Sequence, residues 1–460
     1  MVDISRASKD LRLALTGDTI AARNGFLATG GPTGELVELI RECDAAFTNL
    51  EVLPNDFAGY PAARSDGVHF ATHSGILDEL AEAGFGLFGY ANNHALDYGV
   101  EGLLQALGEF EQRGLTYAGA GKTLAQARMP AYLDQGWGSV GLVACSSTFF
   151  PEQAAGEQTP DVQGRPGINP LRFGVTYEVS KEQLACLQSI AGALGLESQR
   201  REFVQLGFLS DPEDLRILPF VDTNLRVAGT LDAKFRAADS PAVRTRPEEP
   251  NAREILRWIA EARNRAEVVV VSLHAHEQGK SREHPAEFVE SFAKAAVDAG
   301  ADVVTGHGPH LLRGMEMYHG RPIFYSLGNF VGQNELVYKL PADSYRRFGV
   351  DQSLTPSEVF RIRNADGTKG FPADELYWQT VMPICRFESG KLVEIEVVPV
   401  GITRGRTPNT RGQPYLANGE EATKILGKFA SLSREYGVKI SDGDSSRGEG
   451  LHSERALVEL

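Results

Sequence analysis

Short apolar runs alternate with amphipathic segments along most of the chain. The apolar runs predict buried strands at 11–16, 45–50, 85–90, 138–147, 267–273 and 301–306. Apolar residues with helical spacing predict helices at 35–43, 75–84, 99–114, 252–266 and 284–300. We expect the first strand to end at Gly17. Strands that alternate with helices of this length indicate a layered α/β domain whose sheets are covered on both faces.

Two long stretches interrupt this alternation. Residues 150–250 are rich in Pro, Gly, Arg and Glu, with one helix predicted at 180–195, and residues 333–378 are polar and irregular. We interpret both as insertions that form lids or walls around a site. A hairpin is predicted at 315–330, turning at His319-Gly320. The interpretation is one domain over 1–400 followed by a C-terminal extension at 401–460, a helix and then a mobile tail.

The composition narrows the function classes. The chain has 460 residues, 42% of them apolar and 23% charged, which is typical of a globular protein. Its net charge is −15 and it has no Lys/Arg-rich block, so nucleic acid is not an expected partner. Four widely spaced cysteines form no CxxC pair, which argues against a disulfide framework or a thiolate zinc site. With no signal-peptide pattern and no long apolar run, we expect a cytoplasmic protein without membrane contact.

Polar and imidazole side chains follow five of the predicted strands. In chain order these groups are Asp18; Asn49 and Glu51; Asn92, Asn93 and His94; His274, His276 and Glu277; and His307 and His310. They include five of the chain's ten histidines. The carboxyl ends of parallel strands lie along one edge of a sheet, where ligands bind. We therefore expect these side chains to meet in one crevice.

Each group taken alone has a simpler interpretation. A Gly-Asp pair after a strand is usually a turn, and a single histidine at a strand end is more often a core or capping residue than a ligand. "HAHE" at 274–277 and "GHGPH" at 306–310 are more specific, since two glycines and a proline impose an unusual backbone between two histidines. Taken together, the oxygen and imidazole donors favour a site for two divalent ions, Mn, Zn or Fe, about 3.5–4 Å apart.

The motifs "TGD", "TNLE", "ANNHALDYG" and "GADVVTGHGPHLLRGMEMYHGRPIFYSLGNF" together resemble the CapA, or poly-γ-glutamate capsule-synthesis, family. They lie between residues 11 and 332, about two-thirds of the chain. The resemblance implies a fold similar to the calcineurin-like metallophosphoesterases, which is a four-layer α/β sandwich with a dinuclear centre. Family members tied to capsule assembly are commonly secreted or membrane-anchored.

The resemblance also implies roles for individual residues. It assigns six metal ligands: Asp18 and His310 at the first metal, Asn93, His274 and His307 at the second, and Glu51 bridging them. His94 corresponds to a histidine that protonates the leaving group, and Asp97 could orient it. Many family members have Trp-Gly after the strand-end histidine, where this chain has Ala275-His276-Glu277, so His276 is an added ligand or a second acid. The first strand has Thr16 where related enzymes have the aspartate of an Asp-x-His pair, which puts the first metal in doubt.

The expected activity is hydrolysis by a water that two metals activate. The substrate is expected to be a small anion, either a γ-glutamyl-like amide or a phosphoester. Candidate substrate-binding residues are Arg64, Arg313, Arg404 and Arg406. The alternative is a non-catalytic component that binds or assembles a poly-γ-glutamate-like polymer. The sequence is also compatible with a homo-oligomer.

Overall fold

Two β-sheets face each other in the computed structural model, which describes residues 10–27, 30–136, 138–214, 216–222, 232–405, 407, 410–442 and 455–460. The ten-stranded sheet has the order β21-β22-β19-β18-β1-β2-β3-β4, with β17 also on β1 and β20 on β19. Its strands are β1 (Leu11–Ile20), β2 (Ala45–Leu50), β3 (Leu87–Gly89), β4 (Thr116–Ala118), β17 (Asn329–Gly332), β18 (Gln379–Glu388), β19 (Lys391–Ile402), β20 (Pro414–Leu416), β21 (Ile440–Asp442) and β22 (Ala456–Val458).

The six-stranded sheet has the order β15-β16-β14-β13-β7-β6. Its strands are β6 (Ala131–Gln135), β7 (Gly138–Ser146), β13 (Val268–His274), β14 (Val303–His307), β15 (Met315–Tyr318) and β16 (Arg321–Phe324). The predicted hairpin is present as β15 and β16, but β17 leaves it and pairs with β1 in the other sheet. That pairing carries β1 past Gly17 to Ile20, so the expected end of the first strand was wrong.

The apolar run of β13 shows why its sequence does not alternate. Val268 and Val270 pack into the core shared with the ten-stranded sheet, whereas Val269 and Val271 pack into a second core against helices. Those helices are α7 (Glu249–Arg263) and α8 (Glu287–Asp298). A strand buried on both faces must be apolar at every position, which is typical of parallel sheets in α/β proteins.

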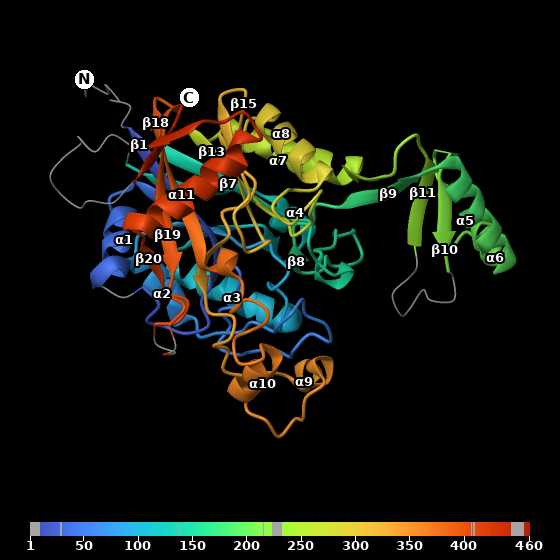
Figure 1. The fold of residues 1–460 in the computed structure, drawn as a ribbon, viewed down its shortest axis with the longest axis horizontal. Coiled ribbons are helices and arrows are strands. Elements are labelled where there is room, and N and C mark those ends of the chain that lie inside the picture. Colours follow the sequence, from blue (N-terminus) through green and yellow to red (C-terminus); the bar gives the residue numbers. More distant parts are fainter. Residues whose placement is uncertain are drawn as a thin grey trace.

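The helices that link the parallel strands of the ten-stranded sheet complete the layers. They are α1 (Gly31–Arg41), α2 (Gly75–Glu82) and α3 (Gly99–Arg113). In Figure 1 these three helices lie on the opposite side of the molecule from α7 and α8, with the two sheets between. The order helix, sheet, sheet, helix is the four-layer α/β sandwich that the resemblance implied, and that expectation is confirmed.

The first insertion is more regular than its composition suggested. It contains β9 (Phe173–Val179), α5 (Lys181–Ala193), α6 (Leu196–Gln205), β10 (Leu218–Val221), β11 (Asp232–Ala237) and β12 (Ala242–Pro247). These strands form a separate sheet, β10-β11-β9-β12, that projects to the right in Figure 1. The helix predicted at 180–195 is present as α5, whereas the strands were not anticipated. We call residues 173–247 the arm.

The second insertion lies on the body of the molecule. It forms α9 (Ala342–Phe348), α10 (Pro356–Arg363) and a 3-10 turn, η3 (Glu375–Trp378). The smaller elements are β5 (Ala120–Gly121) and α4 (Leu124–Arg128), and, at the start of the first insertion, η1 (Pro151–Gln153) and β8 (Gly167–Ile168).

The C-terminal segment packs on the ten-stranded sheet. Helix α11 (Gly419–Arg434) contacts β18 and β19, and β21 and β22 extend the sheet edge beside β19. The division predicted near residue 400 falls inside β19. Of the tail expected to be mobile, 440–442 forms β21 and the central part lies outside the described residues. Within the described chain, no helix is both long and apolar enough to cross a membrane.

Candidate metal centre

The six predicted metal ligands gather in the space where the two sheets meet. Asp18 lies in β1, and Glu51 directly follows β2. His274 and His307 are the last residues of β13 and β14, which are neighbours in the other sheet. We expected one edge of a single sheet, and that was wrong. The carboxyl ends of strands from two facing sheets converge, which encloses the site more deeply than an open edge would.

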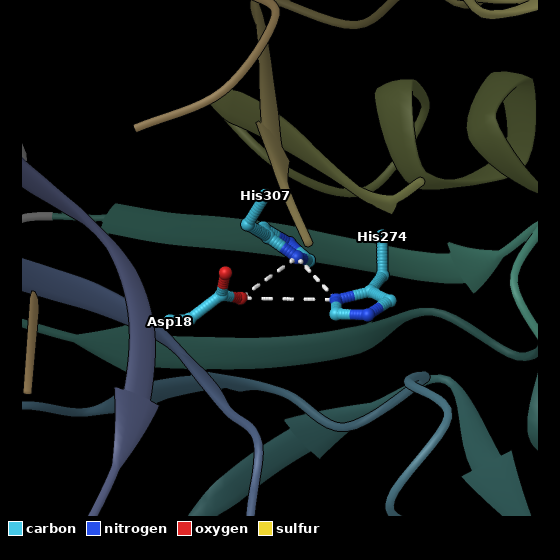
Figure 2. A group of neighbouring side chains, drawn as sticks. All are labelled: Asp18, His274 and His307. Atoms are coloured by element: carbon cyan, nitrogen blue, oxygen red, sulfur yellow. Dashed lines mark hydrogen bonds and ion pairs between the residues drawn. The ribbon is translucent and has the colours of Figure 1, made fainter. Parts of the chain in front are cut away.

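Asp18, His274 and His307 form one group of possible ligands, and Figure 2 shows their side chains directed toward a common point. The two Nδ1 atoms of the histidines are 3.1 Å apart. They lie 3.7 Å (His274) and 3.6 Å (His307) from Oδ1 of Asp18. Ligands at about 2.0–2.1 Å from a tetrahedral metal are separated by about 3.3 Å. The triangle therefore has the size that such an ion requires.

Further possible ligands surround Glu51. Its Oε1 is 3.8 Å from Nε2 of His274, and its Oε2 is 3.7 Å from Nδ1 of His310. The Nε2 atom of His274 also lies 2.9 Å from Oδ1 of Asn93 and 3.1 Å from Nε2 of His276. His310 returns to the first group, with Nδ1 3.4 Å from Oδ2 of Asp18. His274 thus belongs to both groups: its Nδ1 atom faces Asp18 and its Nε2 atom faces Glu51.

Glu51 is the strongest sign that the cluster needs a cation. It is fully buried, and neither carboxylate oxygen has a hydrogen-bond partner in the described chain. Burial, and then the nearby charge of Asp18, raise the pKa of Glu51 well above its usual range. A buried carboxylate without partners is costly unless a proton or a metal satisfies it. The donor set of carboxylate, amide and imidazole therefore fits divalent ions such as Mn, Zn or Fe.

The protonation states of the histidines also suit metal binding. Burial lowers the pKa of His307 to about 4, and it lowers the pKa of His274 and of His276 well below the usual range. Burial would raise the pKa of Asp18, but the hydrogen bond to His310 and the neighbouring imidazoles lower it overall. At neutral pH the cluster therefore offers neutral imidazole nitrogens beside an ionised carboxylate, the forms that bind metals.

Glycine allows the strand-end loops to approach this closely. The backbone N–H of Gly308 donates to Oδ2 of Asp18 at 2.9 Å, and Gly308 has a φ of +115°. A Cβ at this position would lie 2.9 Å from Cδ2 of His276. His310 itself has a φ of +61°. The unusual backbone predicted for "GHGPH" is confirmed, and it turns both histidines of the motif toward Asp18.

Three residues outside the predicted ligand set hold the cluster, and of these only Asn49 was expected in the crevice. Nδ2 of Asn49 donates to Oδ1 of Asp18 at 2.8 Å, and the Ser272 hydroxyl lies 2.8 Å from Nε2 of His307. Oδ1 of Asn329 lies 2.9 Å from Nδ1 of His310. Such contacts fix ligand orientation. Period-2 alternation places Ser272 on the same strand face as His274, and Asn329 lies in "YSLGNF", so the sequence contained both signals.

His94 lies beside the cluster in a fixed orientation. Its Nδ1 donates to Oδ2 of Asp97 at 2.7 Å, and the same oxygen accepts from the backbone N–H of Phe70 at 2.7 Å. The other ring nitrogen, Nε2, is 3.9 Å from Oε1 of Glu51. This arrangement directs one nitrogen of His94 into the site.

Two positions where the sequence departs from the family pattern are now located. The Thr16 hydroxyl donates to the carbonyl of Phe47 at 3.0 Å, so it is engaged with the backbone. His276 belongs to a possible ligand group with Glu51 and His274. This position fits the alternative in which His276 is an added metal ligand.

The predicted substrate-binding arginines do not gather at the cluster. Arg64 is exposed, pairs with Glu152 at 2.7 Å and stacks over Phe150. Arg404 is exposed and lies over the ring of Trp378, 5.9 Å from its centroid. Arg406 lies outside the described residues.

Arg313 is buried in the loop structure beneath the site. It is fully buried and donates to the backbone carbonyls of Ala275 (3.5 Å), His276 (3.3 Å) and Arg282 (3.1 Å). Burial lowers the pKa of its guanidinium to about 10. These contacts hold the segment that carries His276, and they leave the guanidinium turned toward the backbone.

A cavity of about 140 Å³ opens onto the cluster. His94 and His310 line it together with Asp66, Phe70 and residues of the second insertion. Those residues are Asn334, Glu335, Phe360, Arg363, Asn364, Gly370 and Phe371. The second insertion is therefore a wall of the site, as predicted from its composition.

Comparison with known proteins identifies the family. The model of the bacterial capsule synthesis protein family, PGA_cap, matches residues 12–334. The chain belongs to this family. The matched region begins in β1 and ends just after β17, so it contains every residue of the cluster.

The relatives align with different fractions of this chain. An uncharacterised protein of Sinorhizobium fredii, y4sH, is 32% identical over 447 residues, 94% of this chain and 91% of the relative. "Capsule biosynthesis protein CapA" of Bacillus anthracis is 25% identical over 333 residues, 71% and 61% of the two chains. A crystal structure described as a novel phosphatase from Mycoplasma pneumoniae is 9% identical, with a TM-score of 0.39, over 85% of this chain and 94% of that one.

Proposed function

We propose that this protein is a metal-dependent hydrolase with a dinuclear centre that acts on a small anionic amide or phosphoester. The observation that carries the proposal is Glu51, a fully buried carboxylate with two unpaired oxygens among histidines whose pKa values burial has lowered. A cluster of buried charged groups that served only packing would destabilise the fold without a compensating interaction. Perturbed titratable groups beside a cavity are typical of catalytic sites.

Two divalent ions would be held by the strand-end residues. The proposed ligands are Asp18, Glu51, Asn93, His274, His307 and His310, with His276 available as a seventh. When bound, such ions supply a water activated near neutral pH and polarise the bond under attack.

The protein's own contribution to the reaction centres on His94. Because Asp97 accepts from Nδ1, the Nε2 atom is the one that faces the cluster and the cavity. A proton held at Nε2 would be delivered to the departing oxygen or nitrogen of the substrate. Asp97 keeps the ring in that orientation, and its bond to the Phe70 backbone keeps the carboxylate in place.

Metal analysis combined with two chromogenic substrates tests the proposal. Protein purified without chelator should hold up to two Mn, Zn or Fe ions per chain and hydrolyse either p-nitrophenyl phosphate or γ-glutamyl-p-nitroanilide. EDTA should abolish turnover, and the metal should restore it. A chain with no bound metal, or a metal-loaded chain that hydrolyses neither substrate, would count against the hydrolase.

A non-catalytic role is the second candidate. It is favoured by the name of the Bacillus anthracis relative, which describes biosynthesis and no hydrolysis. In that role the chain would bind or help assemble a polymer such as poly-γ-glutamate. Retention of this polymer by metal-loaded protein, without any shortening of the polymer over hours, would support it.

A further inference from the structure

One cation in the cavity wall forms no ion pair within the described residues. Arg363 is the last residue of α10 and lines the same cavity as His94 and His310. Its guanidinium lies over the ring of Phe348, 4.5 Å from the centroid. Within the described part of the chain, no Asp or Glu forms an ion pair with it. Stacking fixes the plane of the guanidinium and leaves its N–H groups at the edges free.

The acids near Arg363 already have other partners. Glu335 lies in the same cavity wall, but it pairs with Arg411 at 2.6 Å and accepts from the Asn364 side chain. Arg363 is exposed, but desolvation of its guanidinium, and then repulsion from Arg347, lower its pKa, while the charge of Glu335 opposes this shift. Arg347 donates to the carbonyl of Ser65. Arg363 and Arg347 therefore lie close enough to repel each other, while Glu335 is shared with Arg411 and Asn364.

The cavity wall carries charges of both signs. Asp66 lies where the cavity meets the cluster, because its Oδ2 accepts from Nδ2 of Asn93 at 3.3 Å. The carboxylate of Asp66 repels an anion at that end unless metal is bound there. Arg363 attracts one in the wall that the second insertion provides. A substrate with a terminal anion would thus enter in one orientation.

We propose that Arg363 binds a carboxylate or phosphate group of the substrate in the cavity that opens onto His94 and His310. This inference rests on the proposed function, which it deepens by assigning the specificity of the site to the second insertion. An Arg fork matches either oxyanion with two parallel hydrogen bonds. The aromatic rings of Phe360 and Phe371 also line the cavity and suit a short aliphatic linker between that anion and the bond to be cleaved.

Binding to metal-free protein tests this inference separately from catalysis. The protein is stripped with EDTA and dialysed, and calorimetry then measures binding of glutarate, glycerol 2-phosphate and uncharged glutaramide. Arg363→Gln should weaken binding of the preferred anion by about 10- to 100-fold, and Arg363→Lys should weaken it less. The stronger of the two anions identifies the group as carboxylate or phosphate.

Arg361→Gln is the matched control. Arg361 lies two residues earlier in α10, is exposed and pairs with Asp366 at 3.2 Å. Its variant should bind the anion as the parent does. The inference is overturned if neither anion binds, if glutaramide binds equally well, or if Arg361→Gln and Arg363→Gln behave alike. Anion binding through Arg363 without turnover of either chromogenic substrate would refute the hydrolase and leave this inference standing.

Discussion

Charged side chains pair with one another in the arm, whereas several in the cluster are buried without a hydrogen-bond partner. In the arm, Glu178 pairs with both Arg236 and Arg244, and Arg200 pairs with Glu197 and Asp211. In the cluster, Asp18, Glu51, His274 and His307 are fully buried, and several oxygens lack any hydrogen bond. The arm's charges are satisfied by one another, whereas those of the cluster require something that the chain alone does not supply.

This difference distinguishes charged residues that only support the structure from charged residues that indicate a function. Exposed ion pairs contribute little to stability and tolerate change. Buried groups without partners destabilise the metal-free chain, so their retention indicates a ligand. The following substitutions test whether the two regions differ as described, beginning with the largest expected effect.

Glu51→Gln should remove the metal centre. The substitution keeps the shape of the side chain and deletes the charge that two ions would share, so metal content should fall from two ions per chain toward none. Turnover should fall to background. Elemental analysis and a p-nitrophenyl phosphate or γ-glutamyl-p-nitroanilide assay measure both.

The matched control for this change lies in the arm. Glu178→Gln also removes one carboxylate that touches two basic groups, yet it should leave metal content and turnover as they are. If both variants retain their metals, Glu51 is not a ligand and the contrast between the regions fails.

His94→Asn should slow turnover by about 10²–10⁴-fold while both metals stay bound. The reason is that Nε2 of His94 faces the cluster and the ring is held by Asp97 rather than by the ligand residues. The measurements are kcat and metal content on the same preparation. His319→Asn is the control, because His319 is an exposed hairpin residue with a φ of +50° that asparagine adopts readily. Loss of metal in His94→Asn would show that His94 is a ligand instead.

The sequence predicted the body of the molecule and the members of the cluster better than their spatial arrangement. Apolar runs located β2 and β13 because strands covered on both faces need apolar residues throughout. The chemistry of "GHGPH" predicted its strained backbone. Which sheet each strand joins depends on long-range pairing such as Asp18 with Asn329, and no local pattern encodes that.

The two insertions show that composition alone does not predict the structure that a segment forms. Both were polar and irregular in sequence, yet one forms a projecting sheet and the other walls the cavity. Arg64 and Arg313 were chosen because they lie near motifs in the sequence, but one pairs with Glu152 and the other with backbone carbonyls. Arg363 lies 53 residues after His310 (363 − 310) and follows no motif, so only the fold brings it to the site.

The stability of the metal-free protein should be greatest near pH 6.5. Below that pH the unfolded chain protonates its imidazoles, whereas the folded chain resists because burial lowers the pKa of His307 to about 4. Stability should therefore fall as the pH drops from about 6.5 to 4, by roughly 3 kcal/mol for this residue. His274 and His276 act in the same direction.

Above that pH, the stability of the metal-free protein changes in the opposite direction because of Glu51. Its raised pKa keeps it protonated in the folded chain while the unfolded chain ionises, so stability should decline as the pH rises. Urea unfolding in EDTA between pH 4.5 and 8.5 measures both arms of the curve. Glu51→Gln should flatten the alkaline arm and steepen the acid arm, because an unfolded glutamate already ionises above about pH 4.5. An unchanged alkaline arm in that variant would mean that Glu51 is ionised in the metal-free protein.

Removing the arm should have the smallest effect. Phe173 and Pro247 are cross-strand partners of β9 and β12, so residues 174–246 can be replaced by Asn-Gly without separating the ends. The stacking of Phe173 on Phe288, with centroids 4.1 Å apart, is kept. Because no described residue of 174–246 belongs to the cluster or lines the cavity, metal content and kcat should stay within about twofold of the parent. A folded, arm-deleted protein that loses its metals would show that the two regions are coupled, and the contrast between paired and unpaired charge would then no longer separate structure from function.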